Sequence, residues 1–255
     1  MKLGVTEQPD SLEQGSHRAY GVVLRRREGS RASQELLLFL KGMGCRRISA
    51  PGAEGPKNRF GGGTEPLMWG TFDFYQSPRR LYLKGVDVRE DYLLIRRSIR
   101  KLHAAVMWCK LLAETLPIGI ECDDLLALFR GSLQNLAHGA DPSLVGLRFV
   151  WRWGALWGVA PSLEYCCACG EALGTGEGER ASRCGDGLLC RRCAAAARED
   201  AVFSSLDGGV LREIRAAAML PRGQFLAWAK SRSAENAPDL GVYARWFQTF
   251  LTAYK

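Results

Sequence analysis

The feature that most constrains this chain is a pair of cysteine motifs in its second half. Cys166-x-x-Cys169 and Cys190-x-x-Cys193 are separated by twenty residues. This two-knuckle spacing lets four thiolates converge tetrahedrally on one Zn²⁺ ion. Four thiolates leave no open coordination position, so the pattern predicts a structural zinc site that holds a fold and does not activate water.

The remaining cysteines and the N-terminal sequence favour metal binding over disulfides. The chain has nine cysteines, an odd number, and no apolar run like that of a signal peptide or a membrane span. We therefore expect a cytoplasmic protein, and disulfides are rare in a reducing cytosol. Four unliganded cysteines at a site that has lost its metal are the alternative.

Two further cysteines leave the ligand set open at one position. Cys167 lies inside the first knuckle, where we expect its side chain to point away, and Cys184 precedes Cys190 by six residues. Replacement of Cys190 by Cys184 as a ligand is therefore an alternative. Three more are interpreted as small buried hydrophobic residues, namely Cys45, Cys109 and Cys122.

Residues 18–88 have the pattern of short β-strands. Segments rich in β-branched or aromatic residues alternate with Gly, Pro and Ser. In "RLYLKGV", Leu81 and Leu83 fall on one face, and Tyr82 and Lys84 fall on the other. Five short antiparallel strands must hide their edges, which favours a small OB-like β-barrel. The expected strands are residues 18–27, 35–40, 45–50, 66–76 and 80–88.

From residue 89 the hydrophobic period becomes that of helices. We expect one helix over residues 89–117, ended by Pro117, and a second over 123–139. A third, over residues 142–161, begins after a capping Asp141 and is apolar on nearly every side, so it should be buried. Three tryptophans fall in this helix and are assigned to the core: Trp151, Trp153 and Trp157.

These patterns predict an α+β fold. A five-stranded OB-like barrel over residues 18–88 is followed by an α-helical domain over residues 89–255. A zinc ribbon or knuckle is inserted into the helical domain at residues 164–195, and a final helix is expected at residues 241–255. Residues 1–17 are expected to be a disordered extension.

Charge is concentrated in the first part of the chain. Residues 1–100 carry 18 Lys and Arg against 11 Asp and Glu, whereas the remaining 155 residues carry 17 against 16. A basic barrel that displays aromatic side chains such as Phe60, Tyr75 and Tyr82 is suited to gripping nucleic acid. A solvated surface that only aids solubility is the alternative. The candidate DNA-binding residues are Arg25, Arg26, Arg27, Arg46, Arg47, Lys57, Arg59, Arg79 and Arg80.

The order of these segments resembles that of the RecO family of bacterial recombination mediators, from about residue 18 to residue 255. The most specific match is "LRFVWRWGALWGVAPSLEYCCACG", which resembles the family's helix running into its first cysteine knuckle. "SRCGDGLLCRRC" resembles the second knuckle, and "GVVLRRREGS" resembles the first strand. "GPKNRFGGGTEPL" looks like the basic loop, although Pro51 and Glu54 stand where the family usually has basic residues.

The resemblance implies a binding protein without bond-making chemistry. Such proteins bind single- and double-stranded DNA, anneal complementary strands, contact the acidic tail of single-strand-binding protein, pair with RecR and help to load RecA, so we expect a nucleoid-associated location. Arg148 and Arg152 share one face of an apolar helix and are candidates for lining a groove for that tail. Pairing of both arginines with Asp or Glu of the same domain is an equal alternative.

Two other classes of protein stay open as alternatives. One is a nucleic-acid-modifying enzyme with an accessory structural zinc site, although the sequence has no clustered carboxylates, nucleophile elbow or phosphate-binding loop. The other is a zinc-stabilised scaffold for protein contacts, whose binding would not depend on salt. We expect no enzymatic activity.

Overall fold

A computed structural model describes residues 12–29, 33–54, 59–174, 179–182, 187–198, 202–205 and 208–232. Contacts divide the chain into two compact units, residues 1–126 and 127–255. The expected domain boundary at residues 88 and 89 stays a prediction. Four expectations concern residues outside the described ranges: Lys57, Cys184, the helix at residues 241–255 and most of the extension at residues 1–17.

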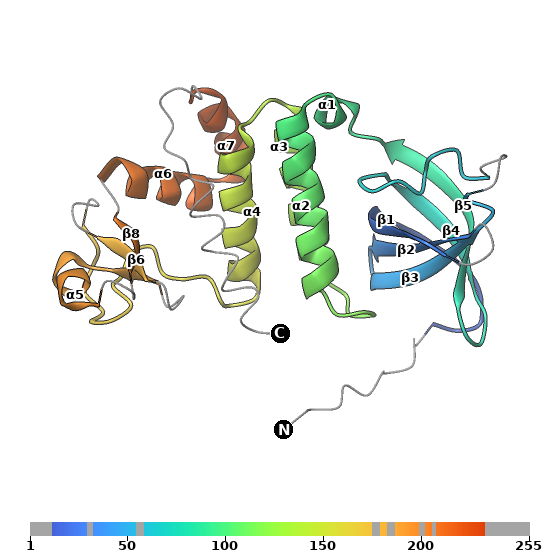
Figure 1. Ribbon diagram of the computed structural model, residues 1–255, viewed down its shortest axis with the longest axis horizontal. Coiled ribbons are helices and arrows are strands. Elements are labelled where there is room, and N and C mark those ends of the chain that lie inside the picture. The colour runs from blue at the N-terminus through green and yellow to red at the C-terminus, as the bar shows by residue number, and fades with distance from the viewer. Residues whose placement is uncertain are drawn as a thin grey trace. The chain divides into compact units, whose positions relative to one another are not determined.

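The first unit contains a closed barrel of five strands (Figure 1). The strands are β1 (Gly15–Glu28), β2 (Ser33–Leu40), β3 (Gly44–Pro51), β4 (Trp69–Gln76) and β5 (Leu81–Glu90). Their order around the barrel is β1-β2-β3-β5-β4, and β1 also pairs with β4. All neighbours are antiparallel except β3 and β5, which are parallel. This five-stranded barrel followed by helices confirms the predicted α+β, OB-like fold.

The barrel encloses a core built by the two-residue period of its strands. Leu36, Leu38 and Leu40 of β2 point into this core, together with Phe72 and Phe74 of β4. Leu81 and Leu83 of β5 join them, as the alternation in "RLYLKGV" predicts. Each strand therefore offers one face to the interior and keeps the other for solvent or for a covering helix.

The helix expected over residues 89–117 is two helices in the structure. Strand β5 continues to Glu90, and Tyr92 adopts a left-handed conformation with φ of 52°, so α1 (Leu93–Arg96) begins only after it. A break at residues 97–98 separates α1 from α2 (Ile99–Thr115), which lies against β1. Arg96 stabilises this junction, because it donates hydrogen bonds to the backbone carbonyls of Asp91 and Pro66.

The second unit combines helices with a small sheet. Helix α3 (Asp123–Ala137) spans the division between the units, and α4 (Pro142–Leu156) follows it. The carboxylate of Asp141 caps α4 by accepting a hydrogen bond from the Ser143 backbone N–H at 2.8 Å, as predicted. The later elements are β6 (Arg180–Ser182), β7 (Leu188–Leu189), α5 (Arg191–Ala196), β8 (Val202–Ser205), α6 (Gly208–Met219) and α7 (Arg222–Lys230).

Helix α4 forms the core of the second unit but is shorter than expected. It ends at Leu156, not at residue 161, because Gly158 turns the chain with φ of 71°. Trp153 is fully buried and contacts the rings of Phe149 and Trp157, which confirms its assignment to the core, whereas Trp151 and Trp157 are partly exposed. None of the described helices combines the length and apolar composition needed to cross a bilayer.

The barrel requires close strand approach at Gly21 of β1 and Gly70 of β4, which are cross-strand partners. A Cβ atom on Gly21 would lie 2.1 Å from the Phe39 carbonyl oxygen. We predict that Gly21→Ala lowers the free energy of unfolding by about 3 kcal/mol, since a backbone strand must move. Urea unfolding followed by circular dichroism measures this change.

Gly85→Ala is the matched control in the same barrel. Its added methyl would meet nothing closer than an Asp73 carboxylate oxygen at 3.7 Å, so we expect a change within about 0.5 kcal/mol. Equal effects of the two substitutions would contradict the close-approach explanation.

Candidate metal centre and nucleic-acid interface

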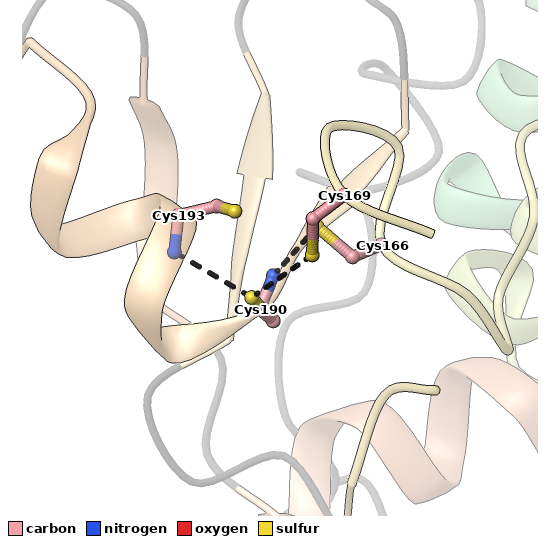
Figure 2. Close-up of side chains that lie close together, drawn as sticks. All are labelled: Cys166, Cys169, Cys190 and Cys193. Atoms are coloured by element: carbon pink, nitrogen blue, oxygen red, sulfur yellow. Dashed lines mark hydrogen bonds between the residues drawn. The ribbon is translucent and has the colours of Figure 1, made fainter. Parts of the chain in front are cut away.

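The four cysteines of the two knuckle motifs come together in the second unit. The sulfur atoms of Cys166, Cys169, Cys190 and Cys193 all lie within 4.8 Å of one another (Figure 2). The Sγ atoms of Cys169 and Cys190 are 3.8 Å apart. A tetrahedral ion with Zn–S bonds of about 2.3 Å needs sulfurs about 3.8 Å apart, so the donor set and its spacing fit zinc.

The first knuckle is a tight turn between Tyr165 and Ala172, which form an isolated bridge. The Cys166 N–H donates to the Glu171 carbonyl at 2.8 Å, and the Gly170 N–H donates to the Cys166 carbonyl at 2.9 Å. Gly170 has φ of 73°, a conformation that glycine adopts without strain. The turn therefore exposes Cys169 at its tip and directs both sulfurs to one side.

The second knuckle leads directly into helix α5. Cys190 is the N-cap residue of this helix, and its sulfur accepts a hydrogen bond from the Cys193 backbone N–H at 3.5 Å. The Cys190 N–H points at the Cys166 sulfur at 3.3 Å, which links the two knuckles (Figure 2). An ion pair between Glu171 and Arg192 at 3.0 Å also joins them.

The protonation of the cluster reflects four sulfurs in one place. Burial acts to raise the pKa of Cys166, but backbone N–H groups of Cys190, Cys169 and Ala168 lower it to about 6. The thiols of Cys169 and Cys190 raise the pKa of Cys193 to about 12. Four thiolates at this spacing therefore need a cation among them.

The other cysteines lie outside this cluster. Cys167 is exposed and its Cβ lies beside Gly187, so its side chain points away from the four sulfurs as expected. Burial raises the pKa values of the Cys45 and Cys109 thiols to about 12, consistent with small core residues. Cys122 is half-buried. The possible exchange of Cys184 for Cys190 concerns a residue outside the described ranges.

The eight basic candidates of the barrel that the structure describes differ in their surroundings. Arg46 is only 4% exposed, and its Nε donates to the Met43 carbonyl, so it lies under the surface. Arg26 forms an ion pair with Glu65. Arg59 is exposed and lies over the Phe60 ring. Arg79 and Arg80 are exposed in the β4–β5 turn, which the Ser77 hydroxyl stabilises by accepting from both backbone N–H groups.

Three of the candidates form a cluster of like charge, Arg25, Arg27 and Arg47. Arg25 pairs with Leu37 of β2, and Leu37 pairs with Arg47 of β3, so the two arginines flank one residue on the same face. Burial and the charges of Arg27 and Arg47 lower the pKa of Arg25, while Glu114 opposes the shift. We call these three residues the β1–β3 arginine cluster.

Strand register connects this cluster to the aromatic candidates. Arg27 pairs with Glu35, Glu35 with Ser49, and Ser49 with Tyr82 of β5, which in turn pairs with Tyr75 of β4. This row of paired residues crosses all five strands, from Arg27 near the end of β1 to Tyr75 near the end of β4. Paired residues of neighbouring strands share a face of the sheet, so Arg27 and the two tyrosines lie on the outer face of the barrel.

The aromatic candidates, like the basic ones, differ in how far they are exposed. Tyr75 and Tyr82 are partly exposed, and the Lys84 ammonium lies 5.6 Å from the Tyr75 ring centroid. Phe60, which the sequence analysis counted as exposed, is 8% exposed and belongs to the barrel core. Lys84 was missed as a basic candidate, although the alternation in "RLYLKGV" already places it on the face of Tyr82.

Arg148 and Arg152 contact the C-terminal end of helix α6. Arg148 is 4% exposed, and its Nη1 donates to the Ala217 carbonyl at 3.0 Å. Arg152 donates from Nε to the Ala218 carbonyl and from Nη2 to the Leu220 carbonyl, each at 3.1 Å. These carbonyls lack partners within the helix, and the helix dipole makes this end negative. Both arginines thus donate hydrogen bonds to backbone carbonyls, and a role in partner binding stays a prediction.

Comparison with known proteins finds similarity to DNA repair proteins. Residues 96–219 match the family model "Recombination protein O C terminal". "DNA repair protein RecO" of an Exiguobacterium species is 28% identical over 151 residues, covering 59% of this chain and 61% of the relative. The protein of the same name from Syntrophobacter fumaroxidans is 24% identical over 156 residues, with coverages of 61% and 62%. The chain thus covers about three fifths of these two relatives.

A third relative matches over more of the chain. "DNA repair protein RecO" of Rubrobacter xylanophilus is 26% identical over 222 residues, which is 87% of each chain. The alignment is therefore long enough to include both the strands and the helices.

The contact of Arg148 with α6 yields a stability prediction. Arg148→Met leaves the Ala217 carbonyl without this donor and removes the guanidinium from the Phe225 ring, whose centroid is 4.5 Å away. We expect the free energy of unfolding to fall by about 1–3 kcal/mol. Chemical denaturation of the purified variant measures the loss.

The control is Arg212→Met, which changes an exposed arginine of α6 and should shift the free energy of unfolding by less than about 0.5 kcal/mol. Equal stability of both variants would contradict the capping role.

Proposed function

Because this chain belongs to the RecO family of DNA repair proteins, we propose that it is a DNA-binding recombination mediator. In this proposal it binds single- and double-stranded DNA, anneals complementary strands, and assists RecA loading together with RecR and single-strand-binding protein. It acts by binding, without bond-making chemistry, in the cytoplasm at the nucleoid. The observation that carries the DNA part is the β1–β3 arginine cluster on the outer face of the barrel, which a row of paired residues connects to Tyr82 and Tyr75.

The β1–β3 arginine cluster supports contact with phosphates. Burial and the like charges of Arg27 and Arg47 lower the pKa of Arg25, so the cluster gains from a polyanion that neutralises it. Tyr75 and Tyr82 lie on the same row and offer ring faces to unpaired bases. Arg79 and Arg80 of the β4–β5 turn, with Arg59, extend the basic surface, and Lys57 stays a candidate.

We further propose that Cys166, Cys169, Cys190 and Cys193 hold one structural Zn²⁺ ion. The ion supplies the positive charge that the four sulfurs need and joins the two knuckles. Arg215 of α6 connects this segment to the helices, because it donates to the carbonyls of Leu163 and Gly174 at 2.9 and 3.1 Å. Metal binding therefore orders a segment that is anchored to the helical unit.

The protein partners are proposed on family membership alone. RecR and the acidic tail of single-strand-binding protein are the partners that the resemblance implies. Arg152 is half-buried and Arg148 is buried, so a tail contact at this pair would use Arg152. DNA binding and zinc binding have their own structural support and can be tested first.

We predict that DNA affinity depends on the β1–β3 arginine cluster. Replacing Arg25, Arg27 and Arg47 with Gln should weaken single-stranded DNA binding by tenfold or more at low salt, because about three phosphate contacts are lost. The slope of log K against log salt should become shallower by about two to three units. Fluorescence anisotropy of labelled DNA at several salt concentrations measures both quantities.

Two variants make this test specific. Replacing Arg212, Arg222 and Lys230 of α6 and α7 with Gln removes the same charge elsewhere and should leave the slope unchanged. Glu35→Gln removes an exposed anion from the row between Arg27 and Ser49, so affinity should rise. Equal loss of affinity in the two arginine variants would mean that only net charge matters.

We predict one zinc ion per chain, bound by four cysteines. Cys169→Ser should lower the bound zinc to well below one equivalent by elemental analysis, and should make the segment around residues 164–195 sensitive to protease. Cys167→Ser is the matched control in the same knuckle and should keep the full equivalent. Retention of zinc by Cys169→Ser would contradict this ligand set.

A further inference from the structure

The outward face of helix α2 carries three large apolar side chains among exposed polar residues such as His103 and Lys110. Ile99 is 88% exposed, Val106 is 43% exposed and Met107 is 45% exposed. The opposite face of α2 buries Ala105, Trp108, Cys109 and Leu112. The core of the first unit therefore leaves several large apolar side chains of this helix uncovered.

Two of the exposed residues form a stripe along the helix. Ile99 and Val106 are seven residues apart, so they share a face at two turns' separation, whereas Met107 is rotated about 100° from Val106 and widens the surface to one side. Short helix α1, at the start of α2 in Figure 1, adds Leu93 at 48% exposed and Leu94 at 59% exposed. We call Leu93, Leu94, Ile99, Val106 and Met107 the α1–α2 surface.

The charges around this surface have one sign. Residues 93–113 contain five Lys and Arg and no Asp or Glu. Arg97 and Lys110 are exposed at the two ends of the stripe, whereas Arg96 is engaged with backbone carbonyls. The nearest acid along the helix is Glu114, which lies 4.0 Å from Lys110. The apolar stripe is therefore bordered by cations.

We propose that the α1–α2 surface is a docking site for an acidic amphipathic helix of a partner protein. A stripe that repeats over two helical turns fits the apolar stripe of a second helix packed along α2. Acidic residues beside that stripe would pair with the bordering cations, which gives the contact its charge specificity.

Other ligands fit this surface less well. Nucleic acid gains little from aliphatic side chains, and the exposed large apolar residues of α1 and α2 include no aromatic ring for a base to stack on. Interfacial membrane helices favour Trp and Phe on their apolar face, whereas Trp108 is buried on the opposite side of α2. The site shares no residue with the β1–β3 arginine cluster, so it goes beyond the proposed DNA contact.

The test uses the full chain and synthetic helical peptides of about 21 residues. The probe carries Leu and Ile at the contact positions of three heptads and Glu at the flanking positions, and its control carries Lys in place of Glu. Fluorescence anisotropy should show binding of the acidic peptide and at least tenfold weaker binding of the basic one.

Two double variants of the chain test the surface itself. Ile99→Ser combined with Met107→Ser should weaken acidic peptide binding by about tenfold. Arg97→Gln combined with Lys110→Gln should weaken it severalfold and reduce its salt dependence.

The matched control is Met219→Ser, which removes an exposed apolar side chain from α6 and should leave peptide affinity unchanged. Single-stranded DNA affinity should be the same in the Ile99/Met107 variant and the unsubstituted chain, which separates this site from the DNA proposal. Unchanged peptide affinity in that variant would overturn the docking site. So would binding of anionic phosphatidylglycerol vesicles without peptide binding, or self-association of the chain that Ile99→Ser abolishes, because the surface would then belong to a membrane or to a second copy.

Discussion

Closure of the five-stranded sheet is the constraint on which the first unit depends. Only two residue pairs, Ile48 with Leu81 and Ser49 with Tyr82, join β3 to β5 and complete the ring. This short parallel contact satisfies the last sheet edge, which would otherwise offer unpaired backbone groups to other chains. It also brings β5 next to β3, so that Tyr82 of the last strand shares a surface with residues of the first three strands. The basic and aromatic row exists only because the ring closes there.

Local sequence patterns predicted the strands and helices themselves better than they predicted which of these elements lie next to one another. The two-residue period and the Gly and Pro punctuation identified five strands, because burial of alternate side chains leaves a direct mark on the sequence. The order of strands around the ring depends on β3 pairing with β5 across about thirty residues, and no local pattern reports that. The left-handed Tyr92 was missed for a similar reason, since the apolar residues of α1 and α2 stay close to one helical phase across the break.

In the candidate site, too, features set by local spacing were predicted and features set by tertiary contacts were not. Cysteine spacing predicted which sulfurs meet, because a knuckle is a local structure and its geometry is nearly fixed by four residues. Composition predicted a basic barrel but could not distinguish Arg46, which is buried, or Arg26, which pairs with Glu65, from the clustered Arg25. Helical spacing placed Arg148 and Arg152 on one face, yet their acceptors lie more than sixty residues away in α6. Such contacts depend on tertiary structure and leave no periodic signal.

The acceptors of Arg148 and Arg152 affect how the second unit responds to its surroundings. Ordinary ion pairs weaken in acid, because their carboxylates take up protons, and exposed pairs weaken in high salt. Backbone carbonyls do not titrate, and the contact of Arg148 with α6 is buried from screening ions. Burial lowers the pKa of Arg148 to about 10, so the guanidinium stays charged at neutral and acidic pH. The joint between α4 and α6 therefore tolerates both acid and salt, whereas contacts between a basic surface and a polyanion weaken as salt rises. Salt would thus act on charged contacts at the barrel surface without loosening this joint in the second unit.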